Sequence, residues 1–349
     1  MKFGIFIEET RRGTGQAAAF HEAFRLVDAA EAWGLDGVWL GEIHFDPARS
    51  VLSASIVVAS AIAARTRRLR VGTAVQLLPL NNPLRIAEEV ATVDHISEGR
   101  FDFGIGRSRS PRAYDGYGIP YAESQARFRE ALEIIREAWK GEPFSYQGEF
   151  HRFEHATVSP RPYQLPHPPI RMAATSEETF LQVARLGLSI FVGLRGMDIP
   201  ELRGHLQAYR KAWHEAGHAG EASAYLRIPL YAGPTEKAAV EEPHESIMYY
   251  FSRQAELIRS AAGHAGTGSA ERREALAAHV ANLSYEQILE TRVAFGSAAG
   301  LVDRLTQLHE ELDLDGIVAE LNPGGLIPAE LEMRSLHILT HQVMPAFKQ

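Results

Sequence analysis

Glu42 and His44 stand two positions apart at the end of the hydrophobic run WLGEIHF, residues 39–45. In an extended strand, side chains two positions apart point to the same side, so Ile43 points to the other side. A carboxylate next to an imidazole can orient the ring and help it to carry a proton in general acid–base chemistry. By spacing alone, the pair could equally form a hydrogen bond that only completes the strand end. Its place at the C-terminal end of a predicted strand favours a functional role.

A second group of residues could bind an anion. The segment GIGRSRSP (104–111) follows a predicted strand and places two glycines, Arg107 and two serines in a loop. Glycine allows the backbone to approach an anion closely, and a guanidinium can donate hydrogen bonds to two phosphate oxygens at once. The dinucleotide-binding pattern G-x-G-x-x-G is not met, because Arg109 occupies its last position. On its own, the loop is as compatible with an ordinary surface turn as with a phosphate site.

The stretch MAATSEETF (172–180) ends a predicted strand and begins a helix. Thr175 or Ser176 would be the N-cap, and Glu178 stands at the capping-box position relative to Thr175. A good cap is one interpretation, and an anion site made of free N–H groups and hydroxyls is the other. In a barrel this helix start would lie beside the Arg107 loop, because the fourth and fifth strands are neighbours. That adjacency favours a shared phosphate site.

The segment HEAGH (214–218) matches the zinc-binding pattern H-E-x-x-H. In that pattern both histidines lie on one face of a continuous helix. Gly217 precedes the second histidine and Gly220 follows it, so we expect the helix to end here. We therefore predict no metal site.

Short hydrophobic runs alternate with longer amphipathic stretches, which is typical of parallel strands joined by helices. Eight strands are predicted, at residues 3–7, 37–40, 69–75, 101–105, 170–174, 189–193, 225–231 and 317–321. The sequence has no Pro/Ser-rich linker that would divide it. The pattern favours the α/β class and a single (β/α)8 TIM barrel with insertions, spanning 1–349, over a doubly wound sheet.

Two stretches interrupt the repeat of strand and helix. Residues 143–169 alternate and turn like a hairpin-like excursion between two barrel units. Residues 262–285 are glycine-rich and polar, and they precede the eighth strand. Long loops of this kind are often lids over active sites, so we expect a mobile lid insertion there.

The composition excludes several classes of protein. The formal net charge is −8 and the basic residues are scattered, so we expect no nucleic-acid partner. The chain has no cysteine, which excludes disulfides and thiolate metal sites and is compatible with a cytoplasmic location. The apolar helix predicted at 50–64 is too short to cross a membrane. Because it is apolar on nearly all sides, we expect it to form a homodimer interface.

Four segments resemble, in the same order, those of the bacterial luciferase-like, flavin-dependent monooxygenases. They are MKFGIF (1–6), AAEAWGLDGVWLGEIHF (29–45), the long run from TRRLRVGTAV to DFGIGRS (66–108) and FGSAAGLVDRL (295–305). That family forms a (β/α)8 barrel, is usually dimeric through helices that include the one at 50–64, and carries a mobile insertion late in the chain. The resemblance therefore implies the barrel, the dimer and the lid.

The resemblance also implies a site for reduced FMN. Arg107 and its loop, together with Thr175 and Ser176, would hold the phosphate, and Ala74-Val75 would form a cis peptide bond against the flavin ring. The cofactor-binding residues that follow from it are Thr73, Ala74, Val75, Gly106, Arg107, Ser108, Ala174, Thr175 and Ser176.

Three residues depart from the family's pattern. Many members have two adjacent histidines where this chain has Ile43-His44, and the luminous members have a cysteine at the position of Gly106. A histidine is common at the position of Asn82. These differences argue against light emission and long-chain aldehyde oxidation, and they leave the flavin site intact.

Together these features predict a two-component FMN-dependent monooxygenase. Reduced FMN from a separate flavin reductase would react with O2 to a flavin hydroperoxide, which oxygenates a small, largely apolar organic substrate. His44 would hydrogen-bond or transfer a proton near the flavin, and Glu42 would orient it. Two alternatives remain open: a deazaflavin-dependent hydride-transfer oxidoreductase, because related members use that cofactor, and a catalytically silent flavin-binding protein.

Overall fold

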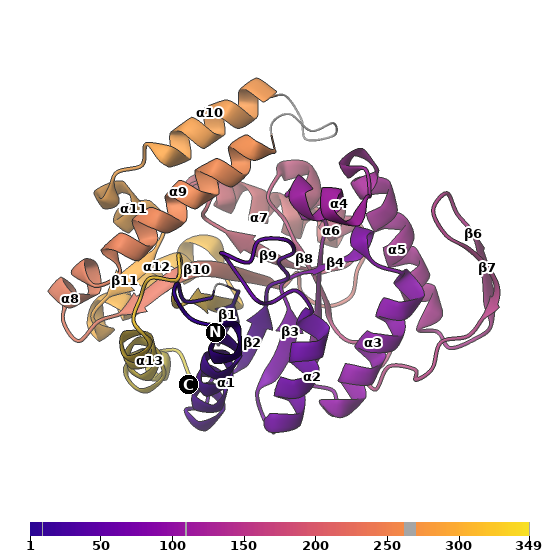
Figure 1. Cartoon of the computed structure of the whole chain (residues 1–349), viewed down its shortest axis with the longest axis horizontal. Helices are drawn as coiled ribbons and strands as arrows, with labels where there is room; N and C mark the ends of the chain where they lie inside the picture. The colour runs from indigo at the N-terminus through magenta and orange to yellow at the C-terminus, as the bar shows by residue number, and fades with distance from the viewer. Residues whose placement is uncertain (9, 109, 262–269, 349) are drawn as a thin grey trace.

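Eight parallel strands form a closed barrel in the computed structural model, which describes residues 1–8, 10–108, 110–261 and 270–348 (Figure 1). Around the barrel the order is β1-β2-β3-β5-β8-β9-β10-β12, and β12 pairs with β1. The strands are β1 (Lys2–Ile7), β2 (Gly37–Leu40), β3 (Arg70–Thr73), β5 (Phe101–Gly106), β8 (Ile170–Ala173), β9 (Ser189–Gly193), β10 (Ala224–Ala232) and β12 (Gly316–Glu320). The predicted (β/α)8 barrel is confirmed.

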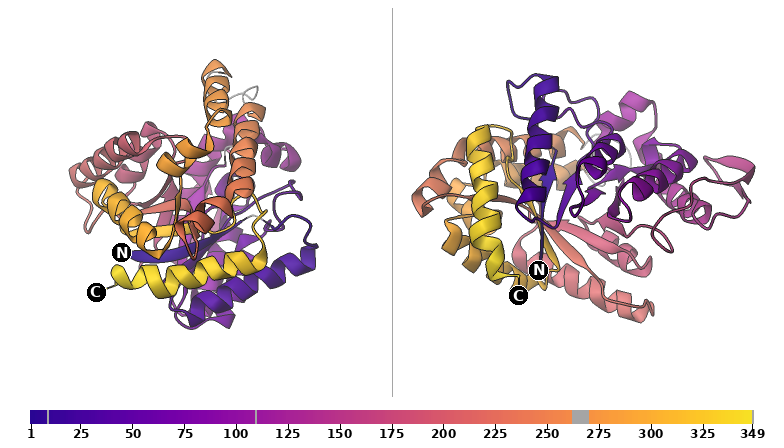
Figure 2. Two further views of the ribbon diagram at one scale, coloured as in Figure 1. Left: turned by 90° about the vertical axis from the view of Figure 1, so that its left-hand side faces the viewer. Right: turned by 90° about the horizontal axis from the view of Figure 1, so that it is seen from below.

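Helices surround the barrel and connect its strands. They are α1 (Gln16–Ala32), α2 (Ser55–Arg65), α3 (Pro83–Ile96), α4 (Pro111–Tyr117), α5 (Ser124–Ala138), α6 (Glu177–Arg185), α7 (Ile199–Glu215), α8 (Glu236–Glu241), α9 (His244–Ser260), α10 (Ala270–Ala281), α11 (Tyr285–Thr291), α12 (Ala298–Leu312) and α13 (Ala329–Ile338). Two short strands extend the sheet: β4 (Gln76–Leu77) pairs with β5, and β11 (Ala294–Gly296) pairs with β10. Helices α1 and α13 lie side by side, so the first and last α-helices of the chain meet (Figure 2).

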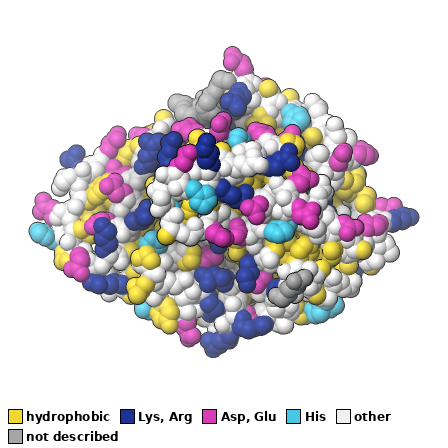
Figure 3. Space-filling model, turned by 180° about the vertical axis from the view of Figure 1, so that it is seen from behind, with side chains coloured by type: hydrophobic (Ala, Val, Ile, Leu, Met, Phe, Trp, Pro, Cys, Tyr) yellow, Lys and Arg dark blue, Asp and Glu magenta, His cyan; other side chains and the backbone are white. Residues whose placement is uncertain are grey.

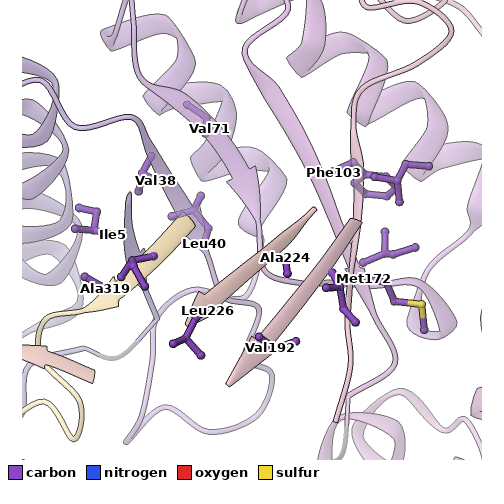
Figure 4. Packing of buried hydrophobic residues seen from close by; sticks show 14 of the residues in the cluster. Ile5, Val38, Leu40, Val71, Phe103, Met172, Val192, Ala224, Leu226 and Ala319 are labelled. Atoms are coloured by element: carbon purple, nitrogen blue, oxygen red, sulfur yellow. The ribbon is translucent and has the colours of Figure 1, made fainter. Parts of the chain in front are cut away.

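Strand residues alternate between the helix-facing side and the lumen of the barrel. The helix-facing residues are apolar and form the main core between strands and helices. Figure 4 shows this layer, with side chains such as Ile5, Val38, Phe103, Val192 and Leu226 packed in it. The hydrophobic runs of the sequence therefore correspond mainly to residues of this layer.

Trp39 fills the middle of the lumen. Its ring meets those of Tyr225 and Phe191 nearly at right angles, with centroids 5.6 and 6.2 Å away. A Cβ on Gly4 would lie 2.0 Å from Cζ3 of Trp39, and one on Gly72 would lie 2.7 Å from its Cδ1. The flanking strands carry glycine at these positions because the indole occupies the space of a side chain.

A buried ion network closes the lumen at the carboxyl ends of the strands. The Arg227 guanidinium lies 3.4 Å from the centroid of the Phe6 ring and pairs with Glu320 at 2.8 Å and with Glu8 at 3.5 Å. Arg49 also pairs with Glu8. Burial alone would raise the pKa of Glu8, but the positive charges of Arg49 and Arg227 outweigh it and hold that pKa at about 2.

The apolar helix predicted at 50–64 begins at Ser55 instead. Ser50 stays outside it, because its hydroxyl donates to the carbonyl of Glu8 and so fixes the preceding loop against β1. On the outer side of α2, Val57 is 68% exposed. The homodimer interface at this helix stays a prediction.

The outer surface carries charges of both signs. On the face seen in Figure 3, basic and acidic side chains are interspersed. Within the described part of the chain, none of the helices has both the length and the apolar character needed to cross a bilayer.

The two insertions have structure of their own. Within 143–169, β6 (Phe144–Gln147) and β7 (Arg152–Ala156) pair as an antiparallel hairpin. Of the lid at 262–285, residues 262–269 lie outside the described residues. Much of the rest is not a loop but helix α10, which lies beside α9 (Figure 1), because the glycines precede it and its own residues are good helix formers. The mobility of the lid stays a prediction.

Replacing Glu8 with Gln should destabilise the barrel. It leaves Arg227 and Arg49 with one buried carboxylate fewer, and breaking such a pair costs about 3–5 kcal/mol. Because the pKa of Glu8 is lowered on folding from 4.5 to about 2, its contribution is fully present above about pH 4.5 and is lost as the pH falls towards 2. Urea denaturation should show a difference between wild type and variant that is largest near neutral pH and shrinks in acid.

The matched control for that variant is Glu142→Gln. The carboxylate of Glu142 pairs with Arg161 at the surface, and its side chain is 78% exposed. Its loss should cost less than about 1 kcal/mol at any pH. Equal losses for the two variants would contradict the role of the ion network.

Candidate active site

Three half-buried residues, Ala74, Val75 and Ala173, form an apolar platform at the carboxyl end of the barrel. They pack on the aromatic side chains of the lumen, which include Phe6 and Trp39. The peptide bond between Ala74 and Val75 is cis, at the position that the resemblance implied. An apolar surface of this kind at a barrel mouth suits one face of a planar ring.

Thr73 and two glycines of β5 hold the backbone of the platform. The Thr73 hydroxyl donates to the carbonyl of Gly104 at 2.7 Å. A Cβ on Gly104 would lie 1.8 Å from the carbonyl oxygen of Thr73, and one on Gly106 would lie 2.3 Å from Cγ2 of Val75. Glycine at both positions lets β5 approach the platform closely. The cysteine of the luminous relatives would not fit at Gly106 unless Val75 moved.

Arg107 lies half-buried in the loop that follows β5. It donates from Nη1 to the Ser124 hydroxyl at 2.8 Å, and its guanidinium lies 5.7 Å from the centroid of the Tyr121 ring. The Tyr114 hydroxyl donates to its carbonyl, and the next residue, Ser108, turns the chain with a φ of 64°. Among the described residues, Arg107 pairs with no carboxylate. A guanidinium held in this way is suited to bind a phosphate.

Helix α6 begins beside the Arg107 loop. Strands β5 and β8 are parallel neighbours, and Gln125 of α5 donates to Gln182 of α6 at 3.4 Å. Ser176 is the N-cap of α6, but its side chain accepts no backbone N–H and instead meets the Thr179 hydroxyl at 2.9 Å. The first N–H groups of the helix are therefore not used by the N-cap side chain and can donate to an anion.

The capping box predicted from Thr175 is wrong. Because Ser176 is the N-cap, Glu178 is the second helical residue rather than the third. Thr175 itself is exposed just before the helix.

Ala174 does not face the barrel mouth with its side chain. It is 2% exposed within the core between strands and helices, and its N–H donates to the carbonyl of Phe191 at 3.0 Å. Strand alternation turns the neighbouring Ala173 towards the lumen, where it joins the platform. The alternation of side chains along β8 thus indicates Ala173, rather than Ala174, as the residue whose side chain lies in the platform.

Glu42 and His44 are in direct contact. Glu42 Oε1 lies 2.7 Å from His44 Nε2, and the two side chains are only 2% and 8% exposed. The other carboxylate oxygen accepts the N–H of Leu77 at 3.2 Å, just after the platform. His44 Nδ1 lies 3.2 Å from the Tyr117 hydroxyl. A chain of hydrogen bonds thus connects the platform segment with Tyr117.

This hydrogen-bonded chain can store and move a proton. Burial raises the pKa of Glu42, although its hydrogen bonds to His44 and Leu77 act in the opposite direction. Tyr117 is 48% exposed, and its pKa is raised by partial burial and by the charge of Glu42. The chain leads from a buried carboxyl group to a hydroxyl at the surface.

The HEAGH segment does not keep its two histidines on one helix. Helix α7 ends at Glu215, and Gly217 adopts a left-handed conformation with a φ of 72°. His218 Nε2 lies 3.0 Å from the carbonyl of Arg185, which fixes the ring outside the helix.

Residues 1–313 match the sequence profile of the luciferase-like monooxygenases. The chain belongs to this family. The match includes the platform, the Arg107 loop, the start of α6 and the Glu42–His44 pair.

Relatives of this luciferase-like chain have different activities. It is 25% identical over 366 residues to the oxygenase component of flavin-dependent trigonelline monooxygenase from Acinetobacter baylyi, a match that covers 100% of the chain and 96% of that protein. It is 34% identical over 193 residues to the F420-dependent glucose-6-phosphate dehydrogenase of Kineococcus radiotolerans, which is 51% of the chain and 56% of that protein. With several other relatives, the chain spans little more than half of their length.

Solved structures share the fold. The oxygenating constituent of 3,6-diketocamphane monooxygenase from Pseudomonas putida, in complex with FMN, is similar to the chain with a TM-score of 0.83 and 21% identity. That match covers 99% of this luciferase-like chain and 98% of the other.

Two substitutions of Glu42 should separate its hydrogen bonds from its charge. Glu42→Ala leaves the buried N–H of Leu77 and the His44 ring without an acceptor, so it should lower the free energy of unfolding by about 2 kcal/mol. Glu42→Gln keeps an acceptor oxygen for these groups, so it should cost less than half as much. Urea denaturation at about pH 7 measures both, and equal losses would show that the charge, not the acceptor, matters.

Proposed function

We propose that this protein is the oxygenase component of a two-component, FMN-dependent monooxygenase. The observation that carries the proposal is the apolar platform next to a half-buried arginine, Arg107, that has no acidic partner in the described part of the chain. The match over nearly the full length of an oxygenase component supports it. The homodimer and the cytoplasmic location expected from the sequence belong to the same proposal.

The described residues fit FMN. Arg107, Ser108 and the start of α6 with Thr175 and Ser176 would hold the phosphate, because a guanidinium, hydroxyls and helix N–H groups all donate to it. The ring would lie on the platform, whose backbone is held by Thr73 and the glycines of β5. Bound at this site, reduced FMN from a separate flavin reductase would supply the electrons for activation of O2, so that one oxygen atom could enter a small organic substrate while the other leaves as water.

Within this proposal His44 acts in proton transfer near the flavin. It can exchange a proton through Nδ1 with the Tyr117 hydroxyl, while Glu42 holds Nε2 and so fixes the ring. Glu42 is a positioning residue, because it is buried against Leu77 and does not reach the platform surface itself. Apolar residues around the platform exclude water from the reacting atoms.

The second candidate is hydride transfer with a deazaflavin. The similarity of 51% of the chain to an F420-dependent dehydrogenase favours it. Both cofactors would use the same platform and the same phosphate site, so binding alone does not separate them.

Arg107→Ala should weaken FMN binding by about 2–4 kcal/mol, because it removes a charge-assisted contact to the phosphate. Quenching of FMN fluorescence on titration with protein measures the affinity. Arg152→Ala, an exposed substitution on the β6–β7 hairpin, is the control and should bind FMN like the wild type. Unchanged affinity in Arg107→Ala would place the phosphate elsewhere.

Rapid mixing of the protein, loaded with chemically reduced FMN, with O2 tests the reaction. We expect a long-lived absorbance of a flavin hydroperoxide, followed by oxidised FMN. The same experiment with reduced F420 should give no such species. Immediate oxidation of FMN with stoichiometric hydrogen peroxide, together with F420 reduction by an alcohol or sugar phosphate, would favour the deazaflavin alternative.

A further inference from the structure

A pocket lined by three arginines opens at the barrel mouth. It lies between the segment after β1, the loop before α2 and helix α9, and Arg12, Arg49, Arg253, Tyr249 and Tyr250 are among its lining residues. In the described part of the chain no acidic side chain lines it, although the whole chain has a formal net charge of −8. We refer to it as the arginine pocket.

Arg12 gives the arginine pocket its positive charge. Its guanidinium lies 4.1 Å from the centroid of the Tyr249 ring and donates to the hydroxyl of the same residue. It forms no ion pair with any described carboxylate. Arg253, by contrast, pairs with Asp46 at 3.8 Å and with Glu256. Stacking on a tyrosine holds the Arg12 guanidinium in place without neutralising it.

The arginine pocket rests on the ion network that closes the lumen. Arg49 pairs with Glu8, and the Tyr250 hydroxyl donates to Glu320 at 3.4 Å. Both carboxylates flank Arg227, which lies on an aromatic ring of the cluster that carries the platform. The arginine pocket and the platform are therefore joined by a short series of direct contacts.

We propose that the arginine pocket binds an anionic group, a carboxylate or a phosphate, of the substrate. The substrate would then have a charged end beside Arg12 and Arg253 and an apolar end at the platform, where it is oxygenated. A guanidinium binds either anion through two parallel hydrogen bonds, which fixes the orientation of the molecule as well as its position. That the bound molecule is the substrate rests on the proposed function, whereas binding of the anion does not.

Calorimetric titration of the full chain in the presence of FMN tests this proposal with three probes: benzoate, phenyl phosphate and the neutral benzamide. At least one of the two anions should bind about tenfold more tightly than benzamide, as expected for a charge-assisted contact. Arg12→Gln should remove most of that preference, and Arg253→Gln should reduce it less, because Arg253 already pairs with Asp46 and Glu256. Arg152→Gln, which makes the same change of charge far from the barrel mouth, should keep it. Arg12 is exposed, so its replacement does not endanger the fold.

Two results would overturn the proposal: equal binding of all three probes by the wild type, or an undiminished anion preference in Arg12→Gln. Titration of the same variants with FMN separates this test from that of the proposed function. FMN affinity should be unchanged in Arg12→Gln, because its phosphate is assigned to Arg107. A preference for anions without any FMN binding would support the arginine pocket as an anion site and contradict the proposed oxygenase. FMN binding without a preference for anions would support the oxygenase and contradict the anion site.

Discussion

The ion pairs of Arg227 with Glu8 and Glu320 close the barrel lumen beneath the candidate active site. Arg227 is in β10, Glu320 ends β12, and Glu8 directly follows β1; these three strands are neighbours in the barrel, and the guanidinium lies on the ring of Phe6. Charges buried in this way are stable only as a set, because each one alone would lose its hydration without compensation. The set contacts the arginine pocket through Arg49 and Tyr250. Arg227 also lies on the ring of Phe6, which belongs to the aromatic cluster that carries the platform.

The platform and the proton-carrying chain are coupled through one short segment. Ala74 and Val75 belong to the platform, and two residues after Val75 the N–H of Leu77 donates to Glu42. Since Glu42 also holds His44, any shift of this segment moves both the surface for the ring and the imidazole. The close contact between Gly106 and Val75 adds the next strand to the same unit. Residues at or just after the ends of β2, β3 and β5 are thus in contact with one another at the barrel mouth.

Much of the barrel and of the candidate site could be predicted from the sequence. Hydrophobic runs indicate the helix-facing side of each strand, and polar residues at the strand ends indicate the site. The side of a strand that a given residue faces and the extent of the lid were harder to predict. The sequence places Ala174 at a strand end, but its side chain packs in the core while the side chain of Ala173 faces the lumen, because neighbouring strand residues point to opposite sides. Part of the predicted lid is helix α10. The ion network and the arginine pocket could not be read from the sequence, because Arg12, Arg227 and their neighbours are scattered along it and meet only when the barrel closes.

A crystal structure of the chain with FMN would test the central claim most directly. We expect the phosphate at Arg107 and the start of α6, the ring on the platform with one face against Ala74 and Val75, and the arginine pocket free of the cofactor. A phosphate bound at Arg12 and Arg253, with the ring away from the platform, would contradict the assignment of both sites and with it the oxygenase proposed for this fold.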